Sequence, residues 1–127
     1  MKRLAFLFLL VLPLIACSNG PDANDAKPLL QKSFYDQQVS ALKGITENFS
    51  KEVVEEYKRA SNSPSKLADV EIMNLKLEDV VKQNNGDYIL KATFNVKLTG
   101  QEGGRVSSRL TMTKVDGKWK LLNRERI

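Results

Sequence analysis

Cys17 is the only cysteine among 127 residues, and the chain contains no histidine. A cysteine nucleophile acts as a thiolate and needs a neighbouring base or positive charge to form it. Zinc sites usually draw their ligands from cysteine and histidine. The composition therefore predicts neither a thiol-dependent enzyme nor a zinc site, and a single thiol leaves no partner for a disulfide within the chain.

Other residue types that can carry catalysis are poorly arranged for it. Ser40 and Lys43 have the spacing of a serine nucleophile and its lysine, but the companion Ser-Asp-Asn and Lys-Thr-Gly motifs are missing. The carboxylates at 55–56 and 78–79 are sequence neighbours, so they point in different directions and form no acid/base pair. No phosphate-binding, calcium-binding or dinucleotide motif occurs. We expect a protein that is not an enzyme and uses no metal or cofactor.

The beginning of the chain has the layout of a secretory signal. Lys2 and Arg3 precede an apolar run, Leu4 to Ile15, which ends in small residues. The run is shorter than the roughly 20 apolar residues of a membrane-spanning helix. We therefore expect residues 1–16 to be removed and the rest of the chain to lie outside the cytoplasm.

The end of this run, Leu14-Ile15-Ala16-Cys17, resembles the lipobox of bacterial lipoprotein precursors. The resemblance implies cleavage before Cys17, a diacylglyceryl thioether on its sulfur, and an acyl chain such as palmitate on the new N-terminus. In that family, Asp after the lipidated cysteine favours retention at the inner membrane. Ser18 occupies that position here, which favours the periplasmic leaflet of the outer membrane in a cell that has two membranes. Several acyl chains together anchor a protein far more firmly than one.

After the signal, the length suffices for one small domain. The chain has 20 basic residues, of which two lie in the signal, and 15 acidic residues. Residues 17–27 contain Cys17 and the segment "SNGPDANDAK", which is rich in turn-forming residues and predicts a flexible tether. We expect the folded domain to cover residues 28–127.

A helix is predicted between Pro28 and about Ala60. Apolar residues recur there at mostly three- and four-residue steps, which is typical of an amphipathic helix. Gly44 falls inside this pattern, where glycine costs about 1 kcal/mol relative to alanine. The pattern allows one helix bent near Gly44 or two short helices. "SNSPSK", residues 61–66, then ends the helical part.

The rest of the chain changes to the two-residue period of strands. Strands are predicted over about 70–82, 88–99 and 106–115, with "TGQEGGR", residues 99–105, as a loop. Asp116-Gly117 predicts a two-residue type I′ hairpin turn and a fourth strand after it. That turn would place Met112 opposite Leu121 on one side of the sheet and Arg109 opposite Arg124 on the other.

These elements predict an α+β fold, in which the N-terminal helix packs on a four-stranded antiparallel meander sheet with one wet face. The order of elements over residues 28–127, and the closing "VDGKWKLLN", resemble the cystatin-like and nuclear-transport-factor-2-like class of small α+β folds. Fold alone implies no function.

Strand alternation places a set of basic side chains on the wet face of the sheet. Such a stripe could contact an anionic partner, such as lipid phosphates or an acidic protein surface. It could equally be an ordinary solvated face. Nucleic acid is not expected as a partner, because no aromatic residues interleave with these side chains. The residues of this face are Lys91, Lys97, Arg109, Lys118, Lys120, Arg124 and Arg126.

The lipid anchor and the missing catalytic groups predict a non-enzymatic domain that binds another envelope component, as an accessory, assembly or exclusion/immunity factor. The alternative is a carrier or sensor for a small ligand, held in a pocket between helix and curved sheet. The residues that could line such a pocket are Phe34, Phe49, Phe94, Met112 and Trp119.

Overall fold

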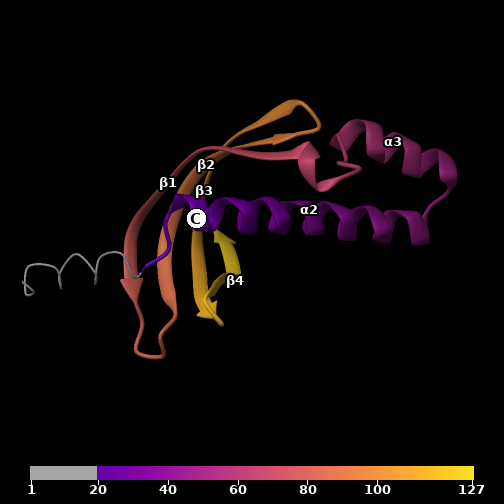
Figure 1. The fold of residues 1–127 in the computed structure, drawn as a ribbon. Helices are drawn as coiled ribbons and strands as arrows, with labels where there is room; N and C mark the ends of the chain where they lie inside the picture. Colours follow the sequence, from indigo (N-terminus) through magenta and orange to yellow (C-terminus); the bar gives the residue numbers. More distant parts are fainter. Residues whose placement is uncertain (1–19) are drawn as a thin grey trace, which may run out of the picture.

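The computed structural model describes residues 20–127, so the predicted signal and the predicted lipidation site at Cys17 lie outside the described residues. Two helices are followed by one 3₁₀ turn and four strands (Figure 1). The predicted α+β fold with a four-stranded antiparallel meander, in the order β1-β2-β3-β4, is confirmed. The elements are α2 (Ala23–Asn48), α3 (Lys51–Ser61), η1 (Leu67–Asp69), β1 (Val70–Lys82), β2 (Tyr88–Leu98), β3 (Gln101–Val115) and β4 (Lys118–Arg126).

Helix α2 begins at Ala23, five residues before the predicted start at Pro28. Asp22 and Asp25 form a capping box, in which each carboxylate accepts the other residue's backbone N–H at 2.9 Å. This reciprocal cap satisfies two N–H groups that would otherwise lack partners at a helix start. Pro28 therefore lies inside the helix, where it lacks a backbone N–H to donate. The predicted tether is correspondingly shorter, because residues 23–27 are helical.

The helical part breaks at Phe49–Ser50 and not near Gly44, so the predicted position of the break is wrong. Gly44 is exposed on a helix that continues to Asn48. Phe49 is extended, with φ −132° and ψ 165°, and Ser50 accepts the Val53 N–H as the N-cap of α3. A serine cap stabilises a new helix by about 1 kcal/mol, whereas a single exposed glycine is tolerated inside one.

The β2–β3 hairpin is longer than the sequence predicts. β3 begins at Gln101, which pairs with Leu98, so the predicted loop at 99–105 is wrong. Thr99 and Gly100 have φ of 49° and 83° and form the turn between the two strands. A bulge in β3 at Gly103–Gly104, opposite Val96 of β2, adds one extra residue to β3 between the pairs Asn95–Arg105 and Lys97–Glu102.

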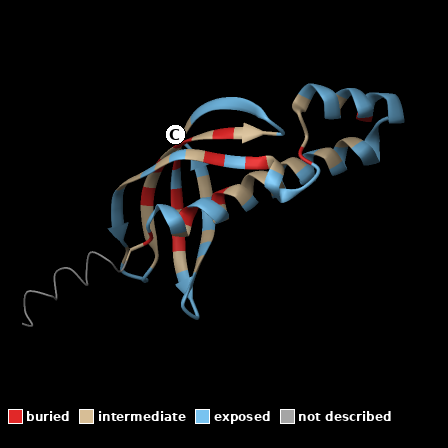
Figure 2. Cartoon of the chain, turned by 45° about the horizontal axis from the view of Figure 1, so that its top comes forward, coloured by how far each residue is buried: buried red, intermediate tan, exposed pale blue. Residues whose placement is uncertain are grey.

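The core lies between one face of the sheet and the first half of α2. Ala26 and Leu30 of α2 are buried against residues of β1, β2 and β3, and Phe94, at 0% exposure, is the largest fully buried side chain of the cluster. Figure 2 shows buried residues where α2 crosses the strands, whereas α3 and the far part of α2 are mostly exposed. The other sheet residues of the core are Ile72, Leu90, Ala92, Val96, Leu110 and Met112.

Helix α2 continues past the edge of the sheet, and α3 folds back alongside it as the second arm of a helical hairpin (Figure 1). Val54 is the buried residue of α3. Gln31 of α2 ties the helix to the sheet, because its Nε2 donates to the backbone oxygens of Leu67 and Val70. Within residues 20–127, none of the helices combines the length and apolarity needed to cross a bilayer.

Candidate functional site

A bulge in β4 decides where its basic side chains point. Beside the turn the register is the predicted one, with Met112 opposite Leu121. Beyond it the pairing shifts, so that Thr111 faces Asn123 and Leu122 is an extra residue without an opposite partner. One extra residue reverses the face of everything after it. Arg124 consequently pairs with buried Leu110 and lies on the face covered by α2.

The predicted pair of Arg109 and Arg124 is therefore wrong. Arg109 faces Glu125, and its Nη1 lies 3.1 Å from Glu125 Oε1. Arg126 pairs with buried Ser108, so it follows Arg124 to the helix side of the sheet. Two of the seven residues assigned to the wet face thus lie on the opposite side.

Acidic residues alternate with the basic residues that remain on the wet face. Lys91 lies opposite Glu78 on β1, and Lys97 lies between Glu71 and Glu102. Opposite charges in directly facing positions of neighbouring strands stabilise a sheet by a few tenths of a kcal/mol up to about 1 kcal/mol. This face has the character of a mixed, solvated surface, and Lys118 and Lys120 extend it along the edge strand β4.

Arg124 lies in a structured environment on the covered face. Its guanidinium carbon lies 3.8 Å from the centroid of the Phe34 ring. Its Nε donates to Ser33 Oγ at 3.0 Å, and its Nη2 donates to Gln37 Oε1. Phe34 in turn packs edge-on against Phe94, with 5.8 Å between ring centroids. Three residues from consecutive turns of α2 therefore hold one planar cation over an aromatic face.

No carboxylate neutralises this cation within residues 20–127, where the five ion pairs all involve other residues. Burial lowers the pKa of Arg124 from its ordinary value. A guanidinium nevertheless stays charged in proteins and offers five N–H donors. Ser33 and Gln37 use part of that capacity, so donors remain for an additional acceptor.

A cleft of about 490 Å³ opens beside Arg124, between α2 and β4. Lys32 in its wall is paired with Asp36, with 2.7 Å between Nζ and Oδ2. Positive charge exceeds negative charge in the lining, and leucine side chains provide apolar wall. Such a site suits a carboxylate or phosphate group that carries an apolar portion, because arginine binds such oxyanions with paired hydrogen bonds. The lining residues are Leu29, Lys32, Ser33, Asp36, Lys120, Leu121, Leu122, Asn123 and Arg124.

None of the five residues predicted to line a pocket between helix and sheet is among the residues that line the cleft, and all but Phe49 belong to the packed core or lie against it. Phe94 and Met112 are fully buried in the core, at 0% exposure. Trp119 packs edge-on against Tyr88 at 5.5 Å, near the turns at one end of the sheet. Phe49 is 55% exposed at the break between α2 and α3. Only Phe34 contacts the candidate site, where it supports Arg124.

The sequence contains one signal for this site that a strict two-residue period does not reveal. Leu121 and Leu122 are adjacent apolar residues in a strand that otherwise alternates, and Leu122 is the inserted residue between the pairs Met112–Leu121 and Thr111–Asn123. Two neighbouring apolar residues in an alternating strand are consistent with an inserted position. In the part of the chain that the structure describes, no cluster of acidic residues is arranged to hold a metal ion.

Comparisons with protein-family models, with curated proteins and with solved structures found no significant match to this chain. The resemblance to the cystatin-like and nuclear-transport-factor-2-like class stays a prediction. Function must therefore be inferred from the chemistry of the signal region and from the geometry of the Arg124 site.

Proposed function

We propose that the chain is a lipid-anchored, non-enzymatic envelope domain that binds another envelope component through an anionic group in the cleft between α2 and β4. The lipobox pattern at residues 14–17 supports the anchor. Ser18 after the lipidated cysteine favours the periplasmic leaflet of the outer membrane. Roles that fit are those of an accessory, assembly or exclusion/immunity factor.

The observation that carries the binding proposal is the unneutralised Arg124 at an open cleft. Partial burial of a guanidinium costs free energy, and the hydrogen bonds to Ser33 and Gln37 leave some of its N–H donors free. A partner carboxylate or phosphate would complete the hydrogen bonding and supply the missing negative charge. A membrane anchor would also raise the effective concentration of the domain near other envelope proteins. Modest intrinsic affinity would then suffice.

The test is capture of the acylated protein with its partner from detergent-solubilised envelope, using wild type and Arg124→Gln. Loss of a hydrogen-bonded, buried charge contact commonly costs about 2–5 kcal/mol of binding free energy. We therefore expect the partner recovered with wild type to be lost with Arg124→Gln. Arg126→Gln is the matched control, because Arg126 lies two residues further on β4 and is exposed.

Recovery of the same partner by Arg124→Gln would contradict the assignment of the binding site. Repeated recovery of the bait alone from wild-type envelope would contradict the binding function itself. Circular dichroism of both variants checks that the substitutions leave the fold intact.

A further inference from the structure

The folded domain begins very close to the predicted lipid. Only Ser18 and Asn19 separate Cys17 from Gly20. A methyl group added to Gly20 would lie 3.3 Å from Val80 Cγ1 and 3.5 Å from the ring of Tyr88, so the backbone of Gly20 rests against these side chains. Pro21 is buried, and Asp22 already caps α2. The chain is thus held against the sheet from Gly20 onward.

This attachment limits how far the domain can stand from a bilayer. Three residues of fully extended chain reach about 11 Å at most. The headgroup layers of a bilayer occupy roughly 5–8 Å on each side of its hydrocarbon core. With acyl chains on Cys17, the surface around Val80 and Tyr88 has to lie in or directly above the headgroups.

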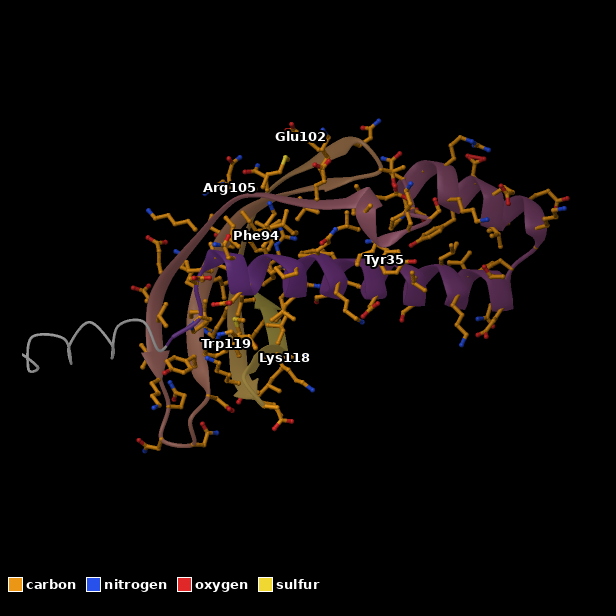
Figure 3. The ribbon with its side chains drawn as sticks, in the orientation of Figure 1. Tyr35, Phe94, Glu102, Arg105, Lys118 and Trp119 are labelled. Atoms are coloured by element: carbon orange, nitrogen blue, oxygen red, sulfur yellow. The ribbon has the colours of Figure 1, made fainter. Side chains whose placement is uncertain are left out.

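The β1–β2 and β3–β4 hairpins have their turns at the same end of the sheet. We define the hairpin end as the β1–β2 and β3–β4 turns with the strand residues beside them. Val80, Val81 and Val115 are 42%, 54% and 42% exposed there. Figure 3 shows Trp119 and Lys118 at this end of the sheet and Glu102 at the opposite end. The hairpin end comprises Val80, Val81, Lys82, Tyr88, Lys114, Val115, Lys118 and Trp119.

The chemistry of the hairpin end suits a membrane interface. Tyrosine and tryptophan are enriched where headgroups meet hydrocarbon. Lysine can lay its aliphatic stem along apolar surface while its ammonium group reaches phosphates. Lys114 Nζ lies 5.4 Å from the centre of the Trp119 ring, and the exposed Val115 follows Lys114 in the chain. The β3–β4 hairpin therefore combines an aromatic ring, a lysine and an exposed apolar side chain.

We propose that the hairpin end docks on the lipid headgroups of the membrane that carries the anchor, an inference that rests on the lipid attachment of the proposed function. The occupant of this surface is the bilayer itself. The domain is then held in one orientation, with the β2–β3 turn directed away from the lipid. Eleven residues of β2 separate the two ends of the sheet, which is about 36 Å of extended chain.

Trp119 is the only tryptophan in the chain and reports directly on this contact. The acylated protein is reconstituted into phosphatidylcholine and phosphatidylglycerol vesicles that contain a headgroup spin label, and its emission is compared with that in unlabelled vesicles. We expect Trp119 emission to be lost in the labelled vesicles. The variant Trp119→Phe with Gln101→Trp moves the reporter to the β2–β3 turn, and its emission should persist.

A second pair of variants keeps Trp119 and changes the surface. Val81→Glu with Val115→Glu places carboxylates on the hairpin end and should restore emission. Val39→Glu is the matched control, because Val39 is 42% exposed on α2, and it should leave the quenching unchanged. Equal quenching at positions 119 and 101, or wild-type quenching in the Val81→Glu, Val115→Glu variant, would overturn the proposed docking.

Flotation of the same samples tests the lipid anchor separately from the docking of the hairpin end. Protein that floats with the vesicles but keeps its Trp119 emission is anchored without docking, so the docking proposal falls and the anchor stands. If the protein purified from membranes carries no acyl chains and does not float with the vesicles, both the anchor and the docking are contradicted.

Discussion

The two halves of α2 differ more than their continuous backbone suggests. Residues 23–36 include both buried residues of the helix, Ala26 and Leu30, and the Gln31 tie to the sheet. Residues 37–48 contain no buried residue, and this half forms the helical hairpin with α3. The first half of the helix is part of the core. The stability of the second half depends on helix caps, side-chain pairs within the helix and contact with α3.

We therefore expect the two halves of α2 to belong to units of unequal stability. A segment with little buried apolar surface opens at lower free energy than the core to which it is joined. Figure 2 shows the same division, with exposed residues dominating the helical hairpin. We expect the hairpin to open locally while the sheet and the first half of α2 stay folded.

Leu30→Ala should give the largest effect and should act on the whole domain. Leu30 is 0% exposed, and removal of a buried leucine side chain commonly costs about 2–5 kcal/mol of unfolding free energy. Urea unfolding monitored by Trp119 fluorescence measures this loss in the sheet, and circular dichroism measures it in the helices. Both midpoints should fall together.

Val39→Ala is the control from the other half of α2. Val39 is 42% exposed, and surface substitutions usually change stability by less than about 0.5 kcal/mol. If Leu30→Ala lowered only the helical transition, or if Val39→Ala cost as much, the proposed division of α2 would be wrong.

The sequence predicted the sheet more accurately than the helical part. The sheet was predictable because alternation in β2 is nearly perfect, and its apolar positions Leu90, Ala92, Phe94 and Val96 are all buried. Asp116-Gly117 correctly predicted the turn between β3 and β4, where both residues have positive φ. In these places local propensity and tertiary burial favour the same structure.

The errors fall where one local signal outweighed another. Gly44 was a poor guide to the helix break, because its penalty is small beside the Ser50 cap that defines the start of α3. Because of the bulge at Leu122, Arg124 lies on the face opposite to the predicted one, and so does the candidate site. A strict two-residue period cannot represent an inserted residue, so the cleft beside Arg124 emerged only from the three-dimensional arrangement.

Ser50→Ala should act on the helical hairpin alone. The Ser50 side chain accepts the Val53 N–H at the start of α3, and loss of such a cap costs about 1 kcal/mol. Hydrogen exchange should accelerate in residues 50–61, while amides of β2 keep their protection. Equal acceleration in β2 would show that the hairpin and the core open as one unit.

Gly44→Ala should stabilise the same region by a slightly smaller amount. Gly44 is helical and exposed, and an added methyl group would meet no atom within 4 Å. Alanine is favoured over glycine in a helix interior by about 0.8–1.0 kcal/mol. Slower hydrogen exchange across residues 40–48, without a change in β2, is the expected result. A destabilised hairpin would instead indicate that Gly44 has a packing role.

Asp69 offers the smallest effect and lies where the two regions join, between α3 and β1. Its carboxylate accepts hydrogen bonds from Ser65 N at 2.9 Å and Lys66 N at 3.1 Å. The backbone hydrogen bond from Ser65 is the main cause that lowers the pKa of Asp69 below its ordinary value of 3.8. A lowered pKa in the folded state means that this stabilisation is present above pH 3.8 and is lost as the pH falls through the depressed value.

Asp69→Asn should therefore loosen the junction at neutral pH and matter progressively less in acid. Hydrogen exchange of residues 62–69 in the two proteins should differ near pH 7. NMR titration of the Asp69 carboxyl group should give a midpoint below 3.8, the ordinary value. A midpoint at or above that value would show that the Ser65 and Lys66 hydrogen bonds do not favour the charged form. Thr99, whose Oγ1 donates to the Asn62 backbone oxygen at 2.7 Å, would still link this junction to the β2–β3 turn.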